Sequence, residues 1–202
     1  MPTPQSFDLV VIGSGPGGYE AAVHAAQLGK SVACVEKAEL GGICLNWGCI
    51  PTKTLIHDAH LFHQVTSEAA AWGLSVDKSK LQWDKIVGRS RSVANTLSSQ
   101  IGFLFKKNKV AHVKGTALVA KTSPAGSTIE VKNEKGELTD TLSAKFVLIC
   151  TGARNREIPG LKPDSKNILT SREAMILKDI PKKLVIIGAG AIGVEFAYFF
   201  NA

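Results

Sequence analysis

The sequence predicts an α/β protein built on dinucleotide-binding βαβ units, and three observations lead to this prediction. An apolar run, a glycine-rich turn, an alanine-rich stretch and a second apolar run follow one another between residues 7 and 36. The same glycine-rich pattern recurs from residue 184. Short apolar runs between residues 110 and 150 predict further strands. With 202 residues, 45% of them hydrophobic, the chain is long enough for one good core or one and a half domains.

The first βαβ unit is complete in the sequence. Phe7–Ile12 is an apolar run interrupted only by Asp8, as expected of a buried strand. The turn Gly13-Ser14-Gly15-Pro16-Gly17-Gly18 has the pattern G-x-G-x-x-G and leads into a helix predicted over Tyr19–Leu28, for which Gly29 is a suitable C-terminal cap. A second strand, Ser31–Glu36, then ends in an acidic residue. This context makes the glycine pattern far more specific than it is alone.

Each position of this fingerprint has a physical reason. Gly13 allows the tight turn, Gly15 lets a pyrophosphate approach the backbone, and Gly18 lets helix and strand pack closely. The helix N-terminus offers free N–H groups and the positive end of its dipole to the phosphates. Glu36 would accept hydrogen bonds from ribose hydroxyls. We therefore predict a dinucleotide site here, the alternative being a glycine-rich turn without a ligand.

The middle of the chain predicts two helices followed by short strands. The helices cover about Lys53–Ala71 and Leu81–Lys107 and are separated by Trp72-Gly73. The predicted strands are Val110–Val113, Leu118–Ala120, Thr128–Val131 and Phe146–Cys150. A hairpin turn is predicted at Asn133–Gly136, between the last two strands.

The second fingerprint repeats the first. LVIIGAGAIGVEFA at residues 184–197 matches LVVIGSGPGGYEAA at residues 9–22, with glycines at Gly188, Gly190 and Gly193. We expect an apolar strand, a glycine turn and a helix. The proline- and charge-rich stretch from residue 153 to residue 183 reads as a connector. Because the sequence stops at Ala202, before a second strand could bury the apolar face of this unit, we expect it to be truncated.

Cys44 and Cys49 are separated by four residues, whereas structural zinc sites and thioredoxin-type pairs have two. A five-residue step on a regular helix leaves Cα atoms roughly 8–9 Å apart, and a disulfide generally needs less than about 7 Å. A disulfide here therefore requires a distorted turn, which Gly48 permits and Pro51, lacking an N–H donor, favours. A strained, accessible disulfide is the catalytic kind; two buried structural thiols are the alternative.

Composition excludes several classes of protein. The net charge of +7 comes from scattered basic residues without interleaved aromatics, which does not support nucleic-acid binding. No apolar window is long enough to cross a membrane, and residues 1–8 lack a leader pattern, so we expect a cytoplasmic protein. Four cysteines are too few for a disulfide scaffold. Cys34 and Cys150 lie in strand-like runs and are predicted to be core residues.

Three histidines, His57, His60 and His63, fall on one predicted helix, where neighbours three positions apart could share a metal ion. No cysteine or carboxylate cluster completes such a site, apart from Asp58 nearby. We expect a solvated helix face and no metal.

With both fingerprints and the cysteine pair, the chain resembles the flavin-dependent pyridine nucleotide-disulfide oxidoreductases, and among them the dihydrolipoamide dehydrogenases most. The strongest motif is GGICLNWGCIPTK; glutathione and mercuric reductases tend to carry Val where this chain has Leu45 and Ile50. The resemblance implies an FAD-binding Rossmann-like domain over residues 1–152, with a three-layer ββα-type core and added antiparallel strands. A connector over residues 153–182 and the start of an NAD-binding Rossmann-like domain over residues 183–202 would follow.

The resemblance also implies which residues hold the cofactors. Those for FAD are Gly13, Gly15, Gly18, Glu36, Lys37, Gly42, Cys44, Lys53, Gly115, Ala117, Thr151 and Gly152. Those for the pyridine nucleotide are Gly188, Gly190 and Gly193, and glycine rather than alanine at the third of these positions favours NAD over its phosphorylated form.

The implied reaction is dihydrolipoamide plus NAD+ to lipoamide plus NADH. Cys44 would exchange with the dithiol substrate, Cys49 would pass electrons to the flavin, and Lys53 would pair with Glu195. Because Lys53 lies one helical turn after Cys49, its cation would favour a thiolate there. The alternatives are another disulfide reductase, of the glutathione or mercuric type, and a catalytically silent FAD-binding fragment.

The resemblance further implies a homodimer, possible association with 2-oxo acid dehydrogenase complexes, and a histidine–glutamate base supplied by the partner subunit. These 202 residues lack that base. We therefore do not expect complete turnover from them alone.

Overall fold

The computed structural model describes residues 5–76, 80–156 and 158–202. The N-terminal residues 1–4, at the start of the segment in which no leader pattern was found, lie outside the described part. Two compact units emerge: one comprises Met1–Asn46 and Thr96–Arg154, the other Trp47–Asn95 and Asn155–Ala202.

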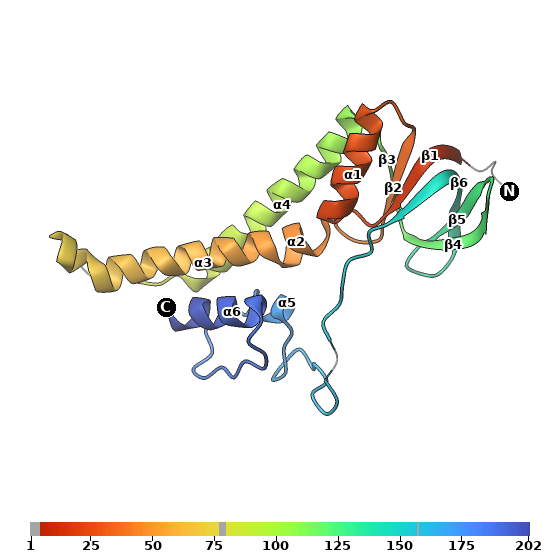
Figure 1. Ribbon diagram of the computed structural model, residues 1–202. Helices are drawn as coiled ribbons and strands as arrows, with labels where there is room; N and C mark the ends of the chain where they lie inside the picture. Colours follow the sequence, from red (N-terminus) through yellow and green to blue (C-terminus); the bar gives the residue numbers. More distant parts are fainter. Residues whose placement is uncertain (1–4, 77–79, 157) are drawn as a thin grey trace. The chain divides into compact units, whose positions relative to one another are not determined.

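The elements, named as in Figure 1, follow the chain from the N-terminus. They are β1 (Gln5–Ile12), α1 (Pro16–Gln27), β2 (Val32–Glu36), α2 (Gly42–Trp47), α3 (Cys49–His63), the π-helix η1 (Gln64–Glu68), the 3-10 helix η2 (Ala69–Trp72), α4 (Trp83–Lys107), β3 (Ala111–Lys114), β4 (Thr116–Ser123), β5 (Gly126–Lys132), β6 (Leu138–Ile149), α5 (Ser171–Ala174) and α6 (Ala191–Asn201). Among the described residues, no helix is both long enough and apolar enough to span a membrane.

The first unit is built on a six-stranded sheet in the order β3-β2-β1-β6-β5-β4. Strands β3, β2, β1 and β6 run parallel to one another. Strand β5 pairs antiparallel with β6 on one side and with β4 on the other. Val10 of β1 sits at the centre, opposite Ala33 on one side and Val147 on the other. The predicted βαβ unit is therefore confirmed, and so are the added antiparallel strands.

The core of this unit shows why the strands are so apolar. Val10 and Val11 are neighbours in β1, so their side chains point to opposite faces, and both are 0% exposed. Val10 packs in one cluster with Ile129 of β5 and Leu142 of β6. The antiparallel strands thus cover one face of the parallel strands, while α1 contacts β1 and β2 (Figure 1). This layering confirms the predicted α/β class.

Two predicted elements differ from the structure by more than three residues at one end. The run Phe146–Cys150 is only the end of β6, because the earlier part of that strand pairs with β5 through a more polar segment that carries no buried-strand signal. The helix predicted from Lys53 begins at Cys49 and is α-helical only to His63. It then continues as η1 and η2 and ends at Gly73, whose φ of 77° is left-handed.

The second unit is held together by aromatic side chains where α3 and α6 pack. Leu55 of α3, Phe196 and Phe199 of α6 and Met175 are buried in one cluster. Trp83, at the start of α4, stacks on Phe199 with ring centroids 5.3 Å apart.

The strand predicted at the start of the second fingerprint does not form. Leu184–Ile187 has no strand pairing among the described residues, and the side chains of Val185 and Ile187 are 86% and 64% exposed. An isolated apolar run has no neighbour to accept its backbone hydrogen bonds, so a strand is not stable there. The helix that follows, α6, does form.

Candidate functional site

The first fingerprint adopts the turn that its glycines predict. Gly13 has a φ of 97°, and a Cβ there would collide with the Cys150 carbonyl. A Cβ on Gly18 would collide with the carbonyl oxygen of Gly13. The Gly13 N–H donates to the Val35 carbonyl at 2.8 Å, which ties the turn to β2. Neither Gly13 nor Gly18 can be replaced without moving the backbone.

Gly15 differs from these two because the space beside it is open: a Cβ there would meet no atom within 4 Å. It caps α1 in an extended conformation, and the first turn of this helix contains no acidic residue. Within the described part of the chain, the N–H groups of Gly15 and Gly17 have no backbone or side-chain acceptor. A Cβ on Gly42 would lie 2.8 Å from the Gly15 Cα, so Gly42 keeps a second segment close by. Two unpaired donors beside open space at a helix N-terminus fit a pyrophosphate.

Glu36 closes the other side of this turn. Its Oε2 accepts hydrogen bonds from the Ser14 N–H and hydroxyl, both at 2.8 Å, and its Oε1 accepts from the Ala38 N–H at 2.9 Å. Burial raises the pKa of Glu36, but the hydrogen bonds from Ser14 and Ala38 outweigh it and the net shift is downward. Ser14, which the sequence analysis did not single out, is therefore the partner that fixes the Glu36 carboxylate. The hydroxyl at the variable position of G-x-G is the signal that could have identified it.

Several of the predicted flavin residues lie at one edge of the sheet. Gly13, Lys37 and Thr151 lie at or just beyond the carboxyl ends of the parallel strands β1, β2 and β6. Gly115 follows β3, and its N–H donates to the Glu36 carbonyl at 2.9 Å. The carboxyl edge of a parallel sheet is where α/β folds bind ligands. Two further predicted residues do not directly follow a parallel strand. Ala117 lies within β4, and Gly152 is exposed with a φ of 70°.

The cysteine segment has the distortion that its spacing requires. Cys44 lies in α2 and Cys49 begins α3; between them Gly48 interrupts the helix with φ −149° and ψ −119°. The helical pattern resumes where the Thr52 N–H donates to the Gly48 carbonyl at 3.0 Å. Cys49 is exposed and Cys44 half-buried. No disulfide joins any of the four cysteines, all of which are described, so the redox bond stays a prediction.

The other two cysteines differ from each other. Cys34 is 0% exposed, as predicted, and Cys150 is half-buried. Burial, with smaller contributions from Glu36 and Cys150, raises the pKa of Cys34 to about 12. Cys34 is therefore an unreactive core thiol at neutral pH.

In the second unit, Lys53 of α3 lies beside Glu195 of α6, with Nζ and Oε1 2.9 Å apart. Their side chains are 62% and 30% exposed. The second fingerprint repeats the turn of the first: Gly188 has a φ of 112°, Gly190 caps α6, and a Cβ on Gly193 would collide with the Gly188 carbonyl. The turn is local and survives without its strand.

The three histidines of α3 contact different partners. His57 Nδ1 lies 3.5 Å from Asp58, His60 Nδ1 lies 3.1 Å from the Tyr198 hydroxyl, and His63 Nε2 lies 3.6 Å from Glu68. Residues 5–76, 80–156 and 158–202 contain no group of three or more His, Cys, Asp or Glu side chains that could hold a metal ion.

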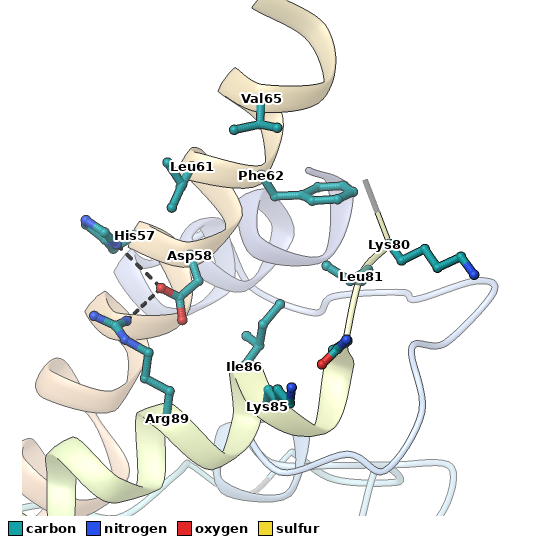
Figure 2. A pocket seen from close by; sticks show the side chains of 11 residues that line it. His57, Asp58, Leu61, Phe62, Val65, Lys80, Leu81, Lys85, Ile86 and Arg89 are labelled. Atoms are coloured by element: carbon teal, nitrogen blue, oxygen red, sulfur yellow. Dashed lines mark hydrogen bonds and ion pairs between the residues drawn. The ribbon is translucent and has the colours of Figure 1, made fainter. Parts of the chain in front are cut away.

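A pocket of about 550 Å³ lies in the second unit, between α3 and the start of α4 (Figure 2). Asp58 faces it: Oδ1 accepts from Arg89 Nη1 at 2.6 Å, and Oδ2 is buried without a hydrogen-bond partner. No residue predicted to bind a cofactor or to act in catalysis lines the pocket. The lining residues are His57, Asp58, Leu61, Phe62, Val65, Lys80, Leu81, Gln82, Lys85, Ile86 and Arg89.

The chain is similar to known proteins over nearly its whole length. The family model described as pyridine nucleotide-disulphide oxidoreductase matches residues 7–202. The dihydrolipoyl dehydrogenase of Chlorobaculum parvum is 45% identical over 96% of this chain, and that of Bacillus subtilis is 40% identical over 95%. The crystal structure of LpdA from Mycobacterium tuberculosis superimposes with a TM-score of 0.77 at 26% identity, covering 88% of this chain and 38% of that one.

The chain spans about 40% of the length of these curated relatives. Members of this family use FAD and NAD(H). The chain belongs to the pyridine nucleotide-disulphide oxidoreductase family.

Proposed function

We propose that this chain is the FAD-binding and redox-disulfide portion of a dihydrolipoyl dehydrogenase. The observation that carries the proposal is the cysteine segment. Cys44 and Cys49 flank a helix break at Gly48, in a chain about 45% identical to proteins named dihydrolipoyl dehydrogenase. A break at this point is what a disulfide across a five-residue step requires.

The chemistry divides between the two cysteines. One thiolate of the substrate dithiol attacks the Cys44 sulfur of the disulfide, and Cys49 leaves as a thiolate. The second substrate thiolate then attacks the mixed disulfide, so the substrate leaves oxidised and both cysteines are reduced. Bound FAD would take the electron pair onward to NAD+. Exposure of Cys49 and partial exposure of Cys44 in the described structure are compatible with these exchanges.

The chain's own residues would hold and tune the cofactor. The Gly15 and Gly17 N–H groups would receive the pyrophosphate, and Glu36 would hold the ribose while keeping the turn in place through Ser14. Lys53, one turn beyond Cys49, would favour a thiolate there and negative charge on the reduced flavin. Glu195, 2.9 Å from the Lys53 ammonium, would fix where that charge lies.

The domain bounds and partners belong to the same proposal. Residues 1–152 would form the FAD-binding domain, residues 153–182 a connector and residues 183–202 the start of the NAD-binding domain, with Gly188, Gly190 and Gly193 at the nucleotide. The working protein would be a cytoplasmic homodimer that accepts a dihydrolipoyl group, including one carried by a 2-oxo acid dehydrogenase complex.

The test uses Cys49→Ser. The purified chain should bind FAD and show visible flavin absorbance, and dihydrolipoamide should bleach that absorbance without oxygen. Cys49→Ser should bind FAD equally well but resist bleaching, because no disulfide can form. The variant Cys150→Ser, which removes a different thiol, is the control and should bleach like the original chain.

Three results would point elsewhere. Bleaching that Cys49→Ser does not reduce would contradict the role of the pair. Flavin binding without any bleaching by dihydrolipoamide would favour the silent fragment. Bleaching by glutathione but not by dihydrolipoamide would favour a different disulfide reductase.

A further inference from the structure

Two guanidinium groups lie over the indole ring of Trp47 in the second unit. The Cζ atoms of Arg91 and Arg172 are 4.0 Å and 3.9 Å from the ring centroid of Trp47. Both distances are well within the range of a cation–π interaction, for which Trp is the best aromatic partner and Arg the commoner cation. Two cations repel each other, so a ring held by both needs fixed arginines.

Both arginines are held from elsewhere in the second unit. Arg91 Nη1 donates to the Met175 sulfur at 3.8 Å, and Met175 is 1% exposed within the apolar cluster of α3 and α6. Arg172 lies in α5, whose first turn is closed by a capping box between Thr170 and Glu173. The Arg172 N–H also donates to the Thr170 hydroxyl at 3.3 Å. The stack is therefore anchored on two separate elements, α4 and α5.

Trp47 directly precedes Gly48, the residue whose backbone interrupts the helix. The far side of this break is fixed by the hydrogen bond from the Thr52 N–H to the Gly48 carbonyl. The near side, at Trp47, is fixed by the arginine stack. Glycine imposes little conformational preference of its own, so both sides must be held for the break to keep one geometry.

We propose that Arg91 and Arg172 are positioning residues that hold Trp47, and through it the Gly48–Cys49 backbone, in the geometry that disulfide exchange needs. The inference rests on the proposed redox role of Cys44 and Cys49. The physical effect is preorganisation: a thiol held in place meets its partner at a higher effective concentration than one on a loose segment.

The experiment measures the dithiol–disulfide equilibrium of Cys44 and Cys49 in the purified chain against defined dithiothreitol ratios. Free thiols are trapped by alkylation, and mass spectrometry then measures the fractions of reduced and disulfide-bonded chain. Trp47→Leu and Arg172→Met should each lower the equilibrium constant for disulfide formation about tenfold, which makes the potential less negative by about 30 mV. Trp47→Phe keeps a ring for the arginines and should lie closer to the original chain.

Trp72→Leu is the matched control. Trp72 belongs to the same unit, is 55% exposed, and has no cation over its ring among the described residues. The dithiol–disulfide equilibrium of Trp72→Leu should equal that of the original chain. This control distinguishes the effect of losing the arginine stack from a general effect of losing a tryptophan. Thermal unfolding of every variant checks that the fold persists. Because Arg172 is exposed, Arg172→Met and Arg172→Lys carry the test if Trp47→Leu does not fold. Lysine keeps the charge but not the planar stacking, so Arg172→Lys should be intermediate.

The two proposals fail in different ways. If the original chain shows no reversible disulfide between Cys44 and Cys49, the proposed function is wrong. If that equilibrium exists but Trp47→Leu and Arg172→Met leave it unchanged in folded protein, the positioning role is wrong.

Discussion

At the scale of single residues, the dinucleotide turn depends on a carboxylate that serves the protein itself. Glu36 is 8% exposed, and Ser14 satisfies one of its oxygens twice, through its N–H and its hydroxyl. A buried carboxylate is stable only when its charge is compensated by hydrogen bonds. Here those bonds also hold the turn between Gly13 and Gly15, so the residue predicted to bind ribose also maintains the fold of the site.

Because the folded protein favours the ionised form of Glu36, we expect the protein to lose stability in acid. Its folded pKa is below the ordinary value of 4.5, so its contribution to the free energy of unfolding is complete above that value. The contribution is lost as the pH falls from about 4.5 through the lower folded pKa. Urea unfolding between pH 7 and pH 3 should show this decline, and Glu36→Gln should flatten it and be less stable at pH 7 by about 1–3 kcal/mol. An unchanged pH dependence in Glu36→Gln would assign the decline to other carboxyl groups.

At the scale of elements, α6 shows how a short helix is held without the sheet that its motif normally serves. Trp83 stacks on Phe199, and the Trp83 Nε1 donates to the Leu177 carbonyl at 2.7 Å. These contacts, with the buried Phe196 and Leu55, keep Glu195 within reach of Lys53. Apolar packing of α6 on α3 therefore determines where a charged pair of the candidate site lies.

Phe199→Ala should destabilise the second unit by about 3–5 kcal/mol, because it removes a buried ring and leaves a cavity against Trp83. Urea unfolding followed by tryptophan fluorescence measures the change. Phe103→Ala is the control: Phe103 is 71% exposed and its loss should change the free energy of unfolding by less than about 0.5 kcal/mol. Equal effects of the two substitutions would refute the anchoring role of Phe199.

At the scale of the whole molecule, the internal repeat shows which structural features depend on local sequence and which depend on tertiary contacts. Leu9–Ile12 and Leu184–Ile187 have nearly the same sequence. The first is a central strand between β2 and β6, and the second is exposed and unpaired within the described part of the chain. The glycine turn after each run is nevertheless the same.

Hydrogen exchange should therefore distinguish the two copies. The amides of Leu9–Ile12 should exchange slowly, since they are bonded within the sheet, and those of Leu184–Ile187 should exchange at nearly the rate of an unfolded peptide. Mass spectrometry of peptic fragments would resolve the two segments. Comparable protection in both would mean that residues 184–187 find a strand partner in solution.

The sequence by itself determined whatever depends on a few consecutive residues. The two glycine turns and the helix break at Gly48 follow from steric limits that act locally. Only the tertiary structure decided which apolar runs become strands, because a strand needs a neighbour and Leu184–Ile187 has none among the described residues. It also decided the long-range contacts, Ser14 with Glu36 and Trp47 with its two arginines, since these residues meet only once the chain has folded. The fold class was therefore predictable from local patterns, whereas the contacts that hold the candidate site in place were not.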